Sequence, residues 1–304
     1  MNTLLHANEA GGDIFDKIYS SVLLDGILDT LKIIPFLFLT YLFMEFIEHR
    51  ASDKTRRFME RSGTFGPAVG GLLGAVPQCG FSSAASNFYS GRVITLGMLI
   101  SIFLSTSDEM LPMMVSGRIS AGAIFAILGY KAAVGILVGF SVDLVLRLAK
   151  GKRDPINIDE ICDNDNCHCE RGILFSALHH TLTVGAFVLI ITLAINALVL
   201  FIGTENISKV MYDKPFISHI LAAIVGLLPN CAASVLLTDL CLEGFITVGT
   251  MLSGLFSGAG VGLLILFKVN KKLKENLAVV GILVISGTLF GFVADLLNFS
   301  ALIQ

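Results

Sequence analysis

The stretch from Gly135 to Leu144 reads GILVGFSVDL, and the stretch from Gly287 to Leu296 reads GTLFGFVADL. The two stretches share six of ten residues and lie 152 residues apart, which is half of the 304-residue chain. In the same register and without gaps, residues 74–144 match residues 226–296 at 18 of 71 positions. Chance would give roughly a third of these identities. We therefore interpret the chain as a tandem duplication.

Hydrophobic residues make up 54% of the chain and charged residues 15%, and the mean hydropathy is +0.80. A soluble protein of this size needs about 25% charged residues to cover its surface. The composition therefore predicts a membrane protein whose main partner is the lipid bilayer. The net charge of −3 lacks the basic field that nucleic-acid binding requires, so we expect no nucleic-acid partner.

Six apolar runs are long enough, or nearly so, for a helix to cross a hydrocarbon core of about 30 Å. They are 31–47, 93–115, 119–148, 173–202, 245–267 and 277–297. Two further apolar runs, 65–89 and 216–242, contain a central proline, Pro77 and Pro229 respectively. Their arms have about a dozen residues each, roughly 20 Å of helix, and reach only past the midplane. Because a proline there frees carbonyl groups that need partners, we predict two re-entrant helical hairpins.

Each half then contains three transmembrane helices and one re-entrant hairpin, so the two halves must be inverted in the membrane. The predicted fold is an all-α polytopic membrane protein with two inverted repeats and about ten helices. The distribution of Lys and Arg supports it: fifteen fall on one side and five on the other, with Lys131 inside a span. We predict an extracytoplasmic N-terminal segment (1–28), a first repeat (29–149), a cytoplasmic loop (150–171) and a second repeat (172–304), with both termini outside.

The predicted hairpin tips carry matching polar residues, Gln78 with Cys79 in the first half and Asn230 with Cys231 in the second. Two thiols brought together by the duplication would form a soft-ligand site for As(III), Sb(III) or a thiophilic metal ion. The alternative is that each cysteine is a small buried apolar residue. Further candidates follow each tip, although hydroxyl side chains also bond back to their own helix. They are Ser82, Ser83, Ser86 and Asn87 in the first half, and Ser234, Thr238 and Asp239 in the second.

Two adjacent carboxylates, Asp108 and Glu109, lie inside the predicted span 93–115, directly after the hydroxyl groups of Ser105, Thr106 and Ser107. An ionisable side chain in hydrocarbon costs at least about 2.5 kcal/mol, so we expect this pair to face a polar cavity. There it would coordinate a cation through oxygen atoms or carry a proton. The alternative is a position at the outer membrane interface.

The predicted cytoplasmic loop contains Cys162, Cys167, His168 and Cys169 in a short acidic stretch. Cytosolic cysteines stay reduced, so we do not expect a disulfide framework. The composition is typical of a metal-binding tract, but the spacing matches no standard zinc module. We interpret the loop as a segment that captures or senses metal ions.

Asp143 and Asp295 occupy matching positions near the ends of two predicted spans. We interpret both as structural, with Asp143 close enough on its helix to pair with Arg147. Gly287 and Gly291 form a small-xxx-small pair, which lets two helix backbones touch and indicates packing rather than chemistry.

The duplicated Pro-x-Cys hairpins, the Ser-Thr-Ser-Asp-Glu segment and the Cys/His loop together resemble the bacterial ten-helix heavy-metal exporters. That family is distantly similar to the arsenical permeases, and some of its members are labelled manganese transporters. The resemblance covers nearly the whole chain from about residue 31, and it implies efflux of a toxic metal or metalloid across the bacterial cytoplasmic membrane. The arsenical permeases are expected to bind As(III) through cysteines, which map here onto Cys79 and Cys231. A harder ion such as Mn²⁺ would instead suit the oxygen ligands of Gln78, Asn230, Asp108, Glu109 and Asp239.

These observations predict a secondary active exporter of a metal or metalloid ion, with H⁺ as a candidate coupling ion and no cofactor. No Gly-x4-Gly-Lys-Ser/Thr motif for ATP binding is present. Transport of a small organic molecule is the first alternative, because Gln, Asn and Ser side chains would serve it equally well. An intramembrane lipid-phosphate enzyme is the second, but the tips contain no Arg to hold phosphate, so we do not expect an enzyme.

Overall fold

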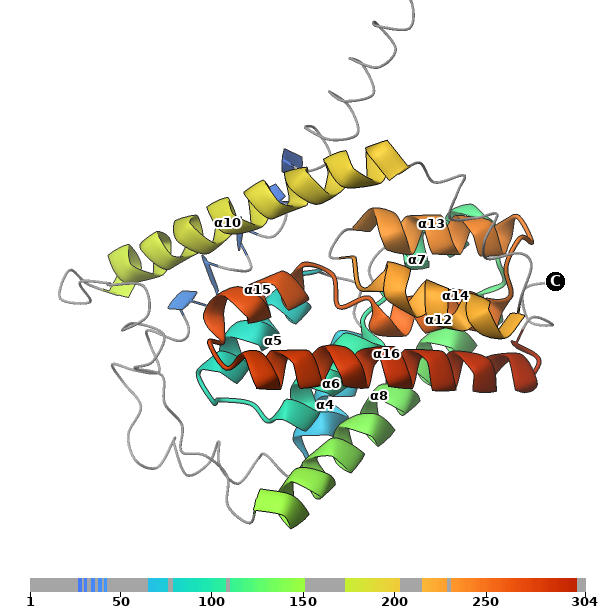
Figure 1. Cartoon of the computed structure of the whole chain (residues 1–304), viewed down its shortest axis with the longest axis horizontal. Helices are drawn as coiled ribbons and strands as arrows, with labels where there is room; N and C mark the ends of the chain where they lie inside the picture. The colour runs from blue at the N-terminus through green and yellow to red at the C-terminus, as the bar shows by residue number, and fades with distance from the viewer. Residues whose placement is uncertain are drawn as a thin grey trace, which may run out of the picture.

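The computed structural model describes residues 65–75, 79–107, 110–150, 173–202, 215–228 and 231–299, together with parts of the segment 27–42. The regular secondary structure of these residues is helical throughout, which confirms the predicted all-α class (Figure 1). In chain order the helices are α4 (Gly66–Gly74), α5 (Cys79–Ser90), α6 (Leu96–Ser105), α7 (Met110–Ser116), α8 (Ala121–Lys150), α10 (Ile173–Ile202), α12 (Pro215–Gly226), α13 (Cys231–Leu242), α14 (Val248–Ser257), α15 (Val261–Val269) and α16 (Leu273–Leu296).

Four segments of the described chain are long and apolar enough to cross a membrane: 96–116, 121–149, 248–269 and 273–296. The chain is therefore a helical membrane protein, as its composition predicts. Two of these segments are not continuous helices, because 96–116 consists of α6 and α7, and 248–269 consists of α14 and α15. The prediction of uninterrupted spans at 93–115 and 245–267 was wrong in this respect.

Both interruptions have a local cause in the sequence. Between α14 and α15 the chain reads Gly-Ala-Gly, and Gly260 has φ 54°, a left-handed conformation that glycine adopts without strain. In the first half, Pro112 is the third residue of α7, and the ring of a proline clashes with the helical carbonyl group four residues before it, which opposes a continuous helix through this region. The length of an apolar run predicts a span, but it does not show where the backbone ladder is broken.

Each half builds the same packing of three helices, with α6 between α4 and α8 and with α14 between α12 and α16. A Cβ atom added at Gly135 on α8 would lie 2.7 Å from the carbonyl oxygen of Ser101. The matching Cβ at Gly287 on α16 would lie 2.7 Å from the carbonyl oxygen of Ser253. Contacts repeated at a spacing of 152 residues support the duplication that the sequence predicts.

The helix α4 runs parallel to α6. Gly66 at the start of α4 lies against Thr95 and Met98 at the start of α6, and Gly74 at its end lies against Ser105 at the end of α6. The intervening helix α5 leads the chain back to the start of α6 through a tight turn. The same turn joins α13 to α14: the N–H of residue 93 bonds to the carbonyl of residue 88 at 2.9 Å, and that of residue 245 to residue 240 at 2.8 Å.

The two halves exchange helices. The helix α5 packs chiefly on α15 of the other half, and α13 packs on α7. The hydroxyl of Ser86 donates to the carbonyl of Gly262 at 2.6 Å, and that of Ser90 donates to the carbonyl of Val269 at 2.9 Å. The two helices therefore run parallel and end together. On the other pair, Gly117 just after α7 lies against Leu242 at the end of α13.

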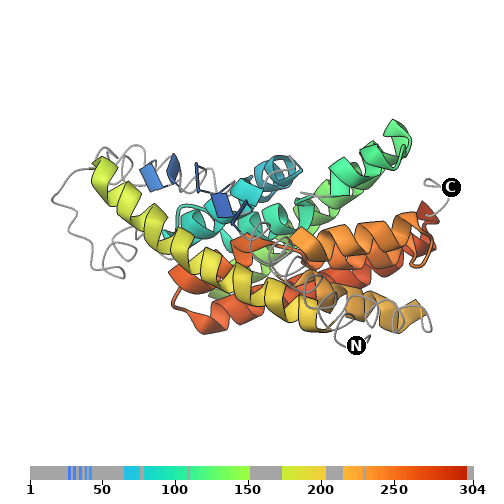
Figure 2. The ribbon, with the colours of Figure 1, turned by 90° about the horizontal axis from the view of Figure 1, so that it is seen from above.

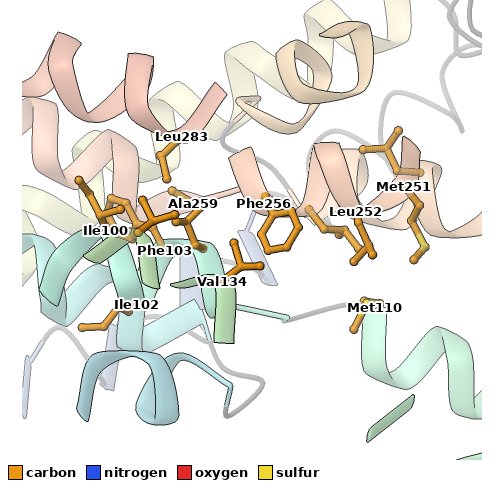
Figure 3. Packing of buried hydrophobic residues seen from close by; sticks show 14 of the residues in the cluster. Ile100, Ile102, Phe103, Met110, Val134, Met251, Leu252, Phe256, Ala259 and Leu283 are labelled. Atoms are coloured by element: carbon orange, nitrogen blue, oxygen red, sulfur yellow. The ribbon is translucent and has the colours of Figure 1, made fainter. Parts of the chain in front are cut away.

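The helix α10 lies along the outside of this bundle against α15 (Figure 2). Tyr41 from the first helical segment packs with it in a small buried cluster that includes Val184 and Ile265. The main core combines both halves: Figure 3 shows Phe103, Val134, Ala259 and Leu283 from α6, α8, the second interruption and α16. The predicted boundary loop 150–171 falls between α8 and α10, and residues 151–172 lie outside the described residues, as do nearly all of residues 1–28.

Candidate functional site

The two interrupted helices meet at one side chain, Lys131. This residue lies within α8, and its side chain is completely buried. Its Nζ donates to the carbonyl oxygen of Thr106 at 2.6 Å and to that of Leu255 at 3.0 Å. Thr106 directly follows α6, and Leu255 is in the last turn of α14. The carboxyl-terminal ends of a half-helix from each repeat therefore converge on one amino group.

The convergence has an electrostatic reason. The last carbonyl groups of a helix have no partner within the helix, and they carry the negative end of the helix dipole. An amino group from Lys131 satisfies one such carbonyl in each half. The ring of Phe256 lies beside it, with its centroid 5.6 Å from Nζ, and contributes a cation–π contact. The sequence analysis located Lys131 within a span but gave it no role, although a lysine in mid-span is itself a signal of function.

Three hydroxyl side chains line the first interruption. Ser105, Thr106 and Ser107 are all buried. Their hydroxyl groups bond to nearby backbone carbonyls: Ser105 to residue 101 at 2.7 Å, Thr106 to residue 102 at 2.7 Å and Ser107 to residue 105 at 3.2 Å. Each hydroxyl oxygen keeps lone pairs that accept hydrogen bonds. The predicted site residues Ser105 and Thr106 thus lie at the interruption, where the carbonyl of Thr106 binds Lys131.

Several predicted site residues lie outside the described residues. Asp108 and Glu109 belong to the interruption between Ser107 and α7, and their placement is not described. The same holds for Gln78 and Asn230 at the hairpin tips, for the side chains of Cys79 and Cys231, and for Cys162, Cys167, His168 and Cys169 in the loop. In the part of the chain that is described, no three His, Cys, Asp or Glu residues lie close enough to hold a metal ion.

The polar residues of α5 are buried and join helices to one another. The amide oxygen of Asn87 accepts from the hydroxyl of Tyr41 at 2.9 Å, and its amide nitrogen donates to the carbonyl of Ser83 at 3.3 Å. Ser86 donates to the carbonyl of Gly262, as described above, while Ser82 is buried where α5 meets α15. Ser86 and Asn87 therefore have packing roles, and Tyr41 is a partner that the sequence gave no reason to select.

The helix α13, which matches α5 in the second half, is more exposed than α5. Ser234 is half-buried, and its carbonyl oxygen accepts from the hydroxyl of Thr238 at 2.8 Å. Asp239 is exposed on the same helix. Unlike the hydroxyls near Lys131, the carboxylate of Asp239 thus lies on the surface of the described chain.

Asp143 and Asp295 have the structural role that we predicted. The backbone N–H of Gly97 donates to Asp143 at 2.9 Å, and that of Gly249 donates to Asp295 at 2.7 Å. Each carboxylate thereby binds the amino-terminal turn of an interrupted helix, where free N–H groups favour a negative charge. Asp295 has a further neighbour in His219, whose Nε2 lies 3.4 Å from Oδ2.

A polar cluster joins the two halves at one end of the bundle. The guanidinium of Arg92 lies 3.0 Å from a carboxylate oxygen of Glu275, and the hydroxyl of Tyr89 donates to the same oxygen at 2.9 Å. Tyr89 is in the last turn of α5 and Arg92 precedes α6, whereas Glu275 is in the first turn of α16. The ends of α5 and α15 and the starts of α6 and α16 therefore share one face, which we call the Arg92 face.

Comparisons of this chain with protein families, with curated proteins and with solved structures found no match. The resemblance to the ten-helix heavy-metal exporters therefore rests on the sequence motifs alone.

Proposed function

We propose that this chain is a secondary active transporter that exports a heavy-metal or metalloid ion through a site where its interrupted helices meet. The observation that carries the proposal is the convergence of Thr106 and Leu255 on the buried amino group of Lys131. Interrupted backbone inside a membrane is tolerated only where protein buries it or where it lines a polar cavity. Interrupted helices from two repeats, meeting at mid-depth, are the architecture of secondary transporters.

The proposal includes two inverted repeats with re-entrant hairpins, and the helix contacts support this arrangement. The unit α6–α7 begins at the Arg92 face, whereas α14–α15 ends there, because Ser90 and Val269 lie together. The opposite face holds the ends of α7 and α13, where Gly117 contacts Leu242. Matching helices of the two halves therefore begin at opposite faces. The parallel packing of α4 and α6 likewise supports a hairpin that enters and leaves on one side.

The distribution of positive charge supports an orientation. Arg92 and the four lysines between residues 268 and 274 lie at the Arg92 face, and α8 also ends there because Asp143 binds Gly97. Arg118 follows Gly117 at the opposite face. By the positive-inside rule the Arg92 face is cytoplasmic, which gives a cytoplasmic central loop and extracytoplasmic termini in a bacterial inner membrane.

The proposed transport site combines the thiols of Cys79 and Cys231 with the carboxylates of Asp108 and Glu109. Support comes from the burial of Ser105, Thr106 and Ser107, which directly precede Asp108 at the interruption. Thiolates suit arsenite, and the oxygen ligands suit Mn²⁺. Metal ion and proton would compete for the carboxylates, and movement of the two hairpins would open the site alternately to each side.

Flux measurements in proteoliposomes test this proposal. We expect pH-dependent flux of Mn²⁺, Zn²⁺ or arsenite in vesicles that contain the full chain. Replacing both Cys79→Ser and Cys231→Ser should abolish arsenite flux but spare Mn²⁺ flux, whereas Asp108→Asn should do the reverse. Glu243→Gln is the matched control, because this carboxylate is exposed after α13 and should not affect flux. Flux of a small organic solute without any response to metal ions would instead support the alternative transporter and contradict the proposal.

A further inference from the structure

We propose that Lys131 is a tethered cation: its amino group, held as an ammonium ion, permanently fills a cation site that the carbonyl oxygens of Thr106 and Leu255 form between the two repeats. The place where the ends of α6 and α14 meet, which we call the crossing, would then need no cation from solution. The inference goes beyond transport, because it concerns what holds the crossing together and does not depend on which solute is carried.

The ligands around Nζ are those of a cation site. The two carbonyl oxygens, at 2.6 and 3.0 Å, can only accept hydrogen bonds. The electron-rich face of the Phe256 ring also lies beside Nζ. Oxygen atoms of this kind coordinate hard metal cations in proteins, and aromatic faces also attract cations. Neither of the two carbonyl oxygens nor the ring face offers a donor to an anion.

The site also joins the two repeats. Thr106 belongs to the first half and Leu255 to the second, so a single group neutralises a half-helix end from each. The residue before it, Tyr130, donates from its hydroxyl to the carbonyl of Phe290 on α16 at 2.7 Å and so fixes α8 against the second half at this level. The position 152 residues after Lys131 is Leu283, which is also completely buried. Of these two matching positions, only 131 therefore carries a charged side chain.

This arrangement predicts what happens when the ammonium group is removed. A short side chain at position 131 would leave the two carbonyl oxygens facing the buried space that the lysine side chain beyond Cβ now fills. An alkali cation such as Na⁺ or K⁺ would fill that space with oxygen ligands. A methionine would fill the space but would provide no charge, so it would leave both carbonyls without a partner.

The experiment compares Lys131→Ala with Lys131→Met in the purified full-length protein, with thermal unfolding followed by circular dichroism. In choline chloride we expect both variants to unfold roughly 10 °C below the wild type, because buried carbonyls lose a charged partner. Replacing choline by Na⁺ or K⁺ at constant ionic strength should raise the Tm of Lys131→Ala in a saturable manner. It should leave the Tm of Lys131→Met and of the wild type unchanged. Equal salt responses of the two variants, or a wild-type Tm for Lys131→Ala in choline, would overturn the inference.

A second pair of variants covers the case in which Lys131→Ala does not fold. In Lys131→Leu combined with Leu283→Lys, the charge moves to the matching position on α16. If the crossing requires one ammonium group between matching half-helix ends, the double variant should recover most of the Tm lost in Lys131→Leu alone. A double variant no more stable than Lys131→Leu, or one that also fails to fold, would contradict the inference.

Discussion

Asp143 and Asp295 lie 152 residues apart and make the same contact. Each accepts a hydrogen bond from a backbone N–H in the amino-terminal turn of an interrupted helix. The two carboxylates differ in their other oxygen. Oδ2 of Asp143 is buried and has no hydrogen-bond partner among the described residues, whereas Oδ2 of Asp295 accepts from the hydroxyl of Thr247 and lies near His219. Matching residues in a duplicated chain therefore need not have matching energetics.

This difference predicts unequal costs of substitution. Asp143→Ala leaves the N–H of Gly97 without its partner, which costs about 1–3 kcal/mol, but it also removes an unsatisfied oxygen. Asp295→Ala removes the acceptor of the Gly249 N–H and of the Thr247 hydroxyl as well as the carboxylate beside His219, so it should lower the Tm more than Asp143→Ala does. Ser141→Ala, on the exposed face of α8, is the control and should change the Tm little. An equal or larger loss in Asp143→Ala would show that the extra contacts of Asp295 contribute nothing.

For individual residues, the sequence indicated what kind of role a side chain has more often than it indicated which group the side chain binds. It indicated that Asp143 is structural, but the bond to the Gly97 N–H follows from the packing of α8 on α6. It also showed a lysine inside a span without showing that two helix ends converge on it. Both partners are backbone groups, and backbone groups leave no mark on the amino-acid sequence.

The interrupted helices are the elements that distinguish this fold from a simple bundle. The apolar runs located the segments that contain them, but the second run continues across the break at 258–260 because Gly-Ala-Gly carries no charged or strongly polar side chain. The long helices α8 and α16 pack on them through glycines at matching positions. The sequence predicted close contact at Gly287, and the structure identifies Ser253 as the residue that it touches.

Paired glycine substitutions test these contacts. Gly135→Ala and Gly287→Ala would each place a Cβ 2.7 Å from a backbone carbonyl oxygen, so we expect a loss of about 1–3 kcal/mol. Gly129→Ala and Gly281→Ala are matched controls on the same two helices, because nothing lies within 4 Å of their Cβ positions. The controls should be neutral or slightly stabilising, since alanine favours a helix more than glycine does. Thermal unfolding measures all four, and equal Tm values within each pair would contradict the packing of α8 and α16.

At the scale of the molecule, the described helices form two halves that are packed alike, with α5 and α13 each packed on a helix of the other half. The duplication was predictable, because it depends on residue identities at a fixed spacing, and the matching contacts of the two halves support it. The exchange was not predictable, since the bonds from Ser86 and Ser90 of α5 to α15 connect different repeats and have no pattern within either one. The cluster of Arg92, Tyr89 and Glu275 was not predictable for the same reason, because it also joins residues of different repeats.

The central claim is that matching positions of the two halves face opposite sides of the membrane. Ser120 and Lys272 test it directly, because they are 152 residues apart and both are exposed next to a helix start. Each is replaced by cysteine in a chain whose six native cysteines are changed to serine. The variants are then labelled with a membrane-impermeant maleimide in right-side-out and inside-out vesicles. We predict that Ser120→Cys reacts only from outside the cell and Lys272→Cys only from the cytoplasmic side; reaction of both from the same side would contradict the account.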